Sequence, residues 1–123
     1  MHIENEFSKM YYTLSKREKK IAKACIDKGL DAEFKEGLEL CGAVIDAWRA
    51  EKIPSNKEAY HQLFGVLKNK DKAIARRYDD LSGSRWLVTV TAQLHDGYLT
   101  EEDIQDFSEE TKVAFKRMEV LFQ

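Results

Sequence analysis

A turn rich in serine, glycine and arginine is the segment of this chain best suited to binding a ligand. Ser82–Arg85 supplies backbone amides, two hydroxyl groups and a guanidinium at the point where a helix is expected to begin. A phosphate or other anion would be held there, because all of these groups can donate hydrogen bonds to it. Arg76 and Arg77 come one to two helical turns earlier and could join the site. The candidate residues for an anion or a protein partner are Arg76, Arg77, Ser84, Arg85 and Trp86.

The same segment also suits an ordinary turn between helices. Ser84 would then cap the following helix, and Asp79 and Asp80 would neutralise the neighbouring arginines. Trp86 is expected in the core, so its loss should mainly destabilise the fold.

Two other segments resemble metal sites but lack ligands. Asp96–Asp103 has the glycine and acids of the second half of an EF-hand calcium loop, but Ala92 and Leu94 stand where oxygen ligands are needed. Glu58 and His61 have the Glu-x-x-His spacing of di-iron bundles, which need a second copy of that motif. We therefore expect no metal and no cofactor, and we expect a helix end at Asp96 followed by a capped helix.

No catalytic set is visible in the sequence. It contains no Gly-x-Ser-x-Gly motif and no glycine-rich phosphate loop, and no histidine stands near either cysteine. Cys25 and Cys41 each fall within an apolar helical pattern, so we expect two reduced, buried thiols of a cytoplasmic protein. The chain is not expected to be an enzyme.

Apolar residues spaced three and four apart predict helices along the whole chain. Ser15 and Ser55 each begin a capping box, Gly29 is expected to end a helix, and Asp31 and Asp71 are expected to cap new ones. Whether the chain breaks at Ser15 is left open. The predicted helices begin at Ile3, Ser15, Asp31, Ser55, Asp71, Trp86 and Thr100, with a restart at Ser108 as an alternative.

The clearest apolar stripe predicts the helix at the centre of the fold. Its residues are Phe34, Leu38, Cys41, Ile45 and Trp48. Further apolar residues widen the stripe, which is typical of a helix buried on most sides.

Trp86–Thr91 is rich in β-formers and could be a strand. However, no second strand is available to pair with it, and a lone strand would leave backbone groups without partners. We therefore predict a buried helix.

Size and composition complete the prediction of the fold. The chain has 123 residues, of which 43% are hydrophobic and 34% charged, and it has one proline. This favours an all-α fold, a compact single-domain bundle of five to seven helices over residues 1–118. Residues 119–123 resemble the recognition sequence of a rhinovirus-type protease used to remove expression tags, so we exclude them from the domain.

Charge gives no general attraction to nucleic acid or to an anionic membrane, because the formal net charge is −2. No apolar run has the length of a membrane span. Basic residues cluster at 16–23 and 68–77 and acidic residues at 101–110, and such runs are typical of solvated helix faces.

These features favour a small cytoplasmic protein-binding module that acts by occlusion or scaffolding. An inhibitor, an immunity or antitoxin-like protein, or a small subunit of an assembly would have this character. Alanine at Arg76, Arg77 and Arg85 is expected to weaken partner binding and to leave the thermal midpoint nearly unchanged. The alternative is a nucleic-acid or phosphate-ligand binder that uses the basic turn. The oligomeric state does not follow from the sequence.

Overall fold

The computed structural model describes residues 12–79 and 85–122, and these residues are all-α, as predicted. They hold four α-helices and two short 3-10 helices, and they include no strand. The prediction of five to seven helices is therefore wrong. The predicted helix that begins at Ile3 lies largely outside the described residues. The elements are α2 (Lys16–Arg49), α3 (Asn56–Tyr78), α4 (Trp86–His95), η2 (Glu101–Ile104), α5 (Glu109–Glu119) and η3 (Val120–Phe122).

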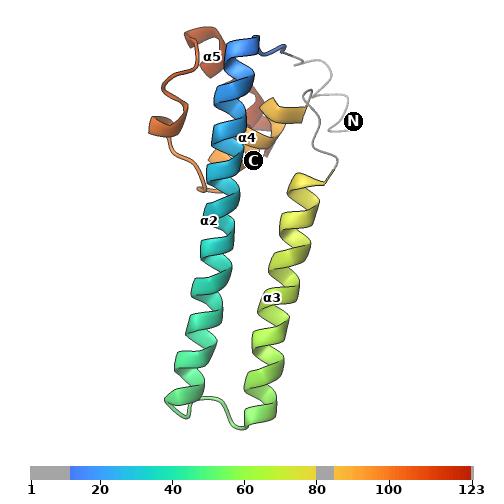
Figure 1. The fold of residues 1–123 in the computed structure, drawn as a ribbon, viewed down its shortest axis with the longest axis vertical. Coiled ribbons are helices and arrows are strands. Elements are labelled where there is room, and N and C mark those ends of the chain that lie inside the picture. The colour runs from blue at the N-terminus through green and yellow to red at the C-terminus, as the bar shows by residue number, and fades with distance from the viewer. Residues whose placement is uncertain (1–11, 80–84, 123) are drawn as a thin grey trace. The chain divides into compact units, whose positions relative to one another are not determined.

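The chain divides into two compact units, which we describe separately. The hairpin unit comprises Asp31–Asp79, and the bundle unit comprises the chain up to Leu30 together with the chain from Asp80 onward. Helix α2 contributes its first half to the bundle unit and its second half to the hairpin unit (Figure 1). The prediction of a single domain over residues 1–118 stays a prediction.

The start of α2 is fixed by a buried carboxylate. Ser15 caps the helix, with its hydroxyl accepting from the Glu18 amide at 3.1 Å. Glu18 is only 6% exposed, and its carboxylate accepts from the Ser108 amide at 3.1 Å and from the Thr111 hydroxyl at 2.9 Å. Burial alone would raise the pKa of Glu18, but these hydrogen bonds outweigh it and hold the pKa below its ordinary value. Glu18 therefore ties the start of α2 to the start of α5.

Helix α2 does not end at Gly29, and Asp31 does not begin a new helix. The glycine lies inside the helix, where a Cβ atom would come within 2.2 Å of Gln93 Nε2. Gln93 is fully buried, and its amide donates to the Ile26 carbonyl at 3.0 Å. The glycine is explained by the close approach of α4, because only a residue without a side chain leaves room there.

Helix α3 begins where the sequence predicts and continues further. The Ser55 hydroxyl accepts from the Glu58 amide at 3.1 Å, which confirms the cap. Asp71 lies within the helix, so the predicted break there is wrong. Two helices joined by a short turn therefore form the hairpin unit (Figure 1).

The segment from Trp86 to the last helix follows the predicted helix and turns. Trp86–Thr91 is helical, as expected. Gly97 has a φ of 84°, and the Tyr98 amide donates back to the Gln93 carbonyl at 2.9 Å, so the glycine supplies a left-handed helix end. Thr100 caps only the short η2. Ser108 begins α5, which confirms the alternative of a restart there.

The core of the bundle unit is made of apolar side chains from α2, α4, η2, α5 and the segments that join them. Phe107 and Phe115 meet edge to face, with ring centroids 5.0 Å apart. The buried apolar residues are Leu14, Ala22, Cys25, Ile26, Leu87, Val90, Leu99, Ile104, Phe107, Phe115 and Met118.

Candidate partner-binding surface

The two helices of the hairpin meet along a line that contains ion pairs and a glycine. Arg77 Nε donates to Glu33 Oε1 at 2.7 Å, and Lys70 Nζ donates to Glu36 Oε1, also at 2.7 Å. The Glu33 side chain is only 1% exposed and that of Arg77 is 17% exposed, so the carboxylate of this pair is buried. Gly37 faces Lys70, whose Cγ would lie 3.1 Å from a Cβ at residue 37. These contacts fix α2 and α3 as an antiparallel pair (Figure 1).

The hairpin unit has almost no apolar core of its own. Of its residues, all of which the structure describes, only Cys41 and Ala59 are buried and apolar. Both side chains are small. Burying them contributes little hydrophobic free energy, since this contribution grows with the apolar area removed from water.

The large apolar side chains of the hairpin lie outside the contact line instead. Phe34 and Leu38 each follow a contact residue of α2 by one position, and Tyr60 follows the buried Ala59 of α3. A helix turns by about 100° per residue. Because the two helices run in opposite directions, the residue that follows a contact residue lies on the same side of the hairpin in both helices.

This side of the hairpin is an apolar surface, which we call the hairpin face. The exposed fractions of its side chains are 49% for Phe34, 71% for Leu38, 69% for Tyr60, 57% for Phe64 and 47% for Leu67. Partly exposed Ile45 lies on the same side of α2, seven residues after Leu38. A fully exposed aromatic side chain has about 150–250 Å² of surface. With the exposed fractions above, the five side chains together present about 500–600 Å² of apolar surface, which is at the upper end of the range of the largest apolar patch on monomeric proteins.

The sequence predicts that the apolar stripe containing Phe34 and Leu38 lies at the centre of the fold, and this prediction is therefore wrong. Its Cys41 is buried, but Trp48 is 44% exposed. Periodicity identifies an apolar stripe, and it does not identify what covers that stripe. Among the described residues, seven of the nine exposed large hydrophobic side chains belong to the hairpin unit.

A groove beside the hairpin turn extends the hairpin face. It has a volume of about 380 Å³ and is lined by Val44, Ile45, Trp48, Asn56, Ala59, Tyr60 and Leu63. The Trp48 indole donates to the Asn56 side chain at 2.8 Å, which fixes the ring at one wall. An apolar groove of this size accepts one or two large apolar side chains.

Charged residues border the hairpin face on both helices. The α2 edge has three acids, Asp31, Glu39 and Asp46, and two bases, Lys35 and Arg49. The α3 edge has three lysines, Lys57, Lys68 and Lys72, whereas Asp71 follows the contact residue Lys70 by one position and lies on the face itself. The two edges thus carry opposite net charge.

The residues of the predicted anion site are divided between the two units. Arg77 is committed to the buried Glu33, whereas Arg76 is exposed. Ser84 lies outside the described residues. Arg85 and partly buried Trp86 belong to the bundle unit, so the combined site stays a prediction.

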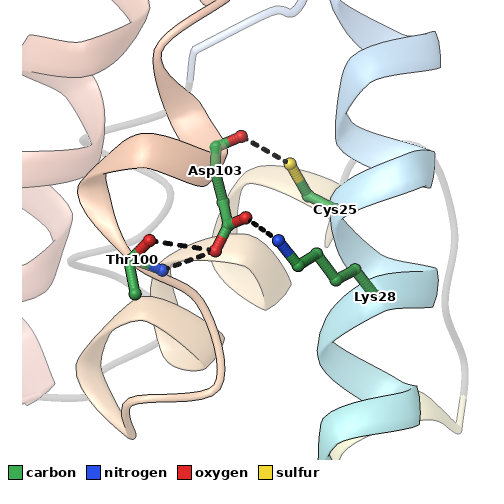
Figure 2. A network of polar contacts seen from close by, with 4 residues as sticks. All are labelled: Cys25, Lys28, Thr100 and Asp103. Carbon is green, nitrogen blue, oxygen red and sulfur yellow. Dashed lines mark hydrogen bonds and ion pairs between the residues drawn. The ribbon is translucent and has the colours of Figure 1, made fainter.

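The cysteine of the bundle unit is placed for packing and not for reaction. Figure 2 shows Cys25 donating through its thiol to the Asp103 carbonyl at 3.4 Å, while the Asp103 carboxylate accepts from Lys28 and Thr100. Burial, reinforced by the charge of Asp103, raises the pKa of Cys25 to about 11. A thiol with such a pKa is a poor nucleophile at neutral pH. Both Cys25 and Cys41 are free and buried, as predicted.

The two metal-like segments have ordinary structural roles. Asp96 ends α4, and Asp103 forms the capping box of η2 with Thr100, as the sequence indicates. Glu58 is in the first turn of α3, and His61 is exposed. In the described part of the chain, no group of three or more His, Cys, Asp or Glu side chains could hold a metal ion.

Comparison of the chain with protein-family models, curated proteins and solved structures finds no match. None of the described helices combines the length and apolar character needed to cross a membrane. The class that the described residues define is a small α-helical protein with an apolar face on a two-helix hairpin.

Proposed function

We propose that this chain is a protein-binding module and that the hairpin face is its binding surface. The observation that carries the proposal is the distribution of apolar side chains in the hairpin unit. Its two buried apolar residues are small, while five large apolar side chains are exposed on one side: Phe34, Leu38, Tyr60, Phe64 and Leu67. Exposed apolar patches of this extent mark interaction sites.

A protein partner suits this surface better than a phosphate ligand. Aromatic and leucine side chains gain binding free energy when another apolar surface removes them from water. Charges at the border would orient the partner and speed the encounter. Of the arginines named for the phosphate alternative, Arg77 is held by Glu33.

The module would act by scaffolding or occlusion, as an inhibitor, an immunity or antitoxin-like protein, or a small subunit does. Two free cysteines support a reducing compartment such as the cytoplasm. The partner's helix would lie along the hairpin face and place apolar side chains in the groove near Trp48.

Affinity capture with variants of the hairpin face tests this function. Tagged wild type, Leu38→Glu and Leu40→Glu are expressed in the cells of origin, and co-purifying proteins are quantified by mass spectrometry. Leu40 is a matched control because it is 47% exposed and lies away from the hairpin face. The amount of partner is the mass of the captured complex in excess of one bait chain. The proposal expects wild type and Leu40→Glu to capture stoichiometric amounts of partner chains, and it expects Leu38→Glu to lose them. Equal recovery with all three baits would contradict it.

A further inference from the structure

We infer that the partner on the hairpin face is a second copy of this chain, so that two hairpins form a four-helix bundle. This inference rests on the proposed function and specifies its partner. Three features of the hairpin unit lead to it: the missing core, the area of the face, and the charges at its edges.

The missing core is the first feature. A four-helix bundle buries apolar stripes from four helices in a common centre, and each helix contributes one stripe. In this hairpin, α2 and α3 each turn such a stripe to the same side, and the only apolar residues buried between them are small. A second identical hairpin, placed face to face, would supply the two stripes that are missing. Phe34, Leu38, Phe64 and Leu67 would then lie in the centre.

The area of the face is the second feature. A stable interface of standard size buries about 800 Å² on each partner, and in homodimers about 65% of that area is apolar. The apolar part required of each copy is therefore close to the 500–600 Å² estimated for the hairpin face. A twofold pair needs the same patch on both copies, and one face of this size meets that requirement.

The charges at the edges are the third feature. In a face-to-face pair related by a twofold axis along the bundle, the α2 edge of one copy lies beside the α3 edge of the other. Three acids and two bases on α2 then meet three lysines on α3. Opposite net charges favour this arrangement over one in which the two lysine-rich α3 edges meet.

Sedimentation equilibrium of the purified full chain tests the inference. Wild type and Leu40→Glu are expected to show twice the chain mass of 14.3 kDa over a wide range of concentration. Leu38→Glu and Phe64→Glu should raise the dissociation constant by about 100-fold or more, because each would bury two carboxylates in the apolar centre. Phe64→Ala should weaken the dimer in the same direction. Far-UV circular dichroism confirms that each variant keeps its helices.

The outcomes separate this inference from the proposed function. A monomeric wild type, or a dimer unaffected by Leu38→Glu, Phe64→Glu and Phe64→Ala, would overturn the second copy as the partner. The proposed function would then stand or fall by affinity capture alone. If a monomeric wild type captures a different protein through Leu38, only the identity of the partner is wrong.

Discussion

Gly29 of α2 and Gln93 of α4 approach so closely that a Cβ atom at residue 29 would lie 2.2 Å from Gln93 Nε2. We predict that Gly29→Ala destabilises the protein by about 1–3 kcal/mol through overpacking, despite a gain of about 1 kcal/mol in helix propensity. Urea denaturation measures the free energy of unfolding.

Gly65→Ala is the control for this prediction, because nothing lies within 4 Å of a Cβ at that helical position. It should stabilise the protein by about 0.5–1 kcal/mol. Adding Gln93→Ala to Gly29→Ala should recover part of the loss, since the obstructing amide is then gone. If both glycine variants proved equally stable, the close approach would have no energetic role.

In the sequence alone, a glycine that ends a helix cannot be distinguished from a glycine that makes room for a neighbouring helix. Gly29 follows an apolar stripe and precedes Asp31, which together favour a helix end and a new cap. The glycine is instead accounted for by a close contact with Gln93, which lies 64 positions away in the sequence. By contrast, the caps predicted at Ser15 and Ser55 are confirmed.

The candidate site shows the same limit. Periodicity identified the stripe through Phe34, Leu38 and Trp48, but it predicted burial because apolar stripes usually face a core. The structure shows that the α2–α3 contact uses the neighbouring positions, among them Glu33 and Gly37. A charged residue and a glycine do not contribute to an apolar pattern, so periodicity does not reveal this contact line. Periodicity instead predicts that the exposed face is the core.

Removal of the buried ion pair should destabilise the hairpin. Arg77→Ala would leave the Glu33 carboxylate buried without its partner, at a cost of about 3 kcal/mol. This replaces the earlier expectation that alanine at Arg77 leaves the thermal midpoint unchanged. Thermal unfolding followed by circular dichroism measures the effect.

Arg76→Ala is the matched control, because Arg76 is exposed on the same turn of α3. Its effect should stay within about 0.5 kcal/mol. The double variant Glu33→Leu with Arg77→Met should recover most of the stability, since it removes both charges together. A midpoint in Arg77→Ala equal to that of Arg76→Ala would show that the ion pair is not needed.

Acid should weaken the junction between α2 and α5 through Glu18. Its pKa is lower in the folded protein than the ordinary value of 4.5, so its stabilising contribution is present above about pH 4.5 and is lost as the pH falls through the folded pKa. Glu18→Gln should cost about 1.5–3 kcal/mol at neutral pH, because a hydrogen-bonded charge is removed. Denaturant titrations at several pH values measure this cost.

The gap in stability between wild type and Glu18→Gln should narrow below pH 4.5. Some acid sensitivity will remain in the variant, because the pKa of Asp103 is also lowered by its hydrogen bonds from Lys28 and Thr100, against the opposing effect of burial. Exposed Glu110→Gln serves as the control. A gap that stayed constant down to the lowest pH would refute the assignment to Glu18.

Cys25 should resist alkylation in the folded protein. The residue is 5% exposed, and its thiol has a pKa of about 11, so little thiolate is present at neutral pH. Iodoacetamide labelling followed by peptide mass spectrometry should show labelling at least about tenfold slower than in urea-unfolded protein. Rapid labelling of Cys25 without denaturant would contradict the described burial.

Hydroxyl-radical footprinting of wild type and Leu38→Glu, with side-chain oxidation read by mass spectrometry, tests the central claim most directly. If a second copy covers the hairpin face, Phe34, Tyr60 and Phe64 are protected in wild type and oxidised in the variant. Val113, which is 46% exposed in the bundle unit, should be oxidised equally in both and serves as the internal reference. Equal oxidation of Phe34, Tyr60 and Phe64 in the two proteins would show that the hairpin face is uncovered in the purified chain and would contradict the account.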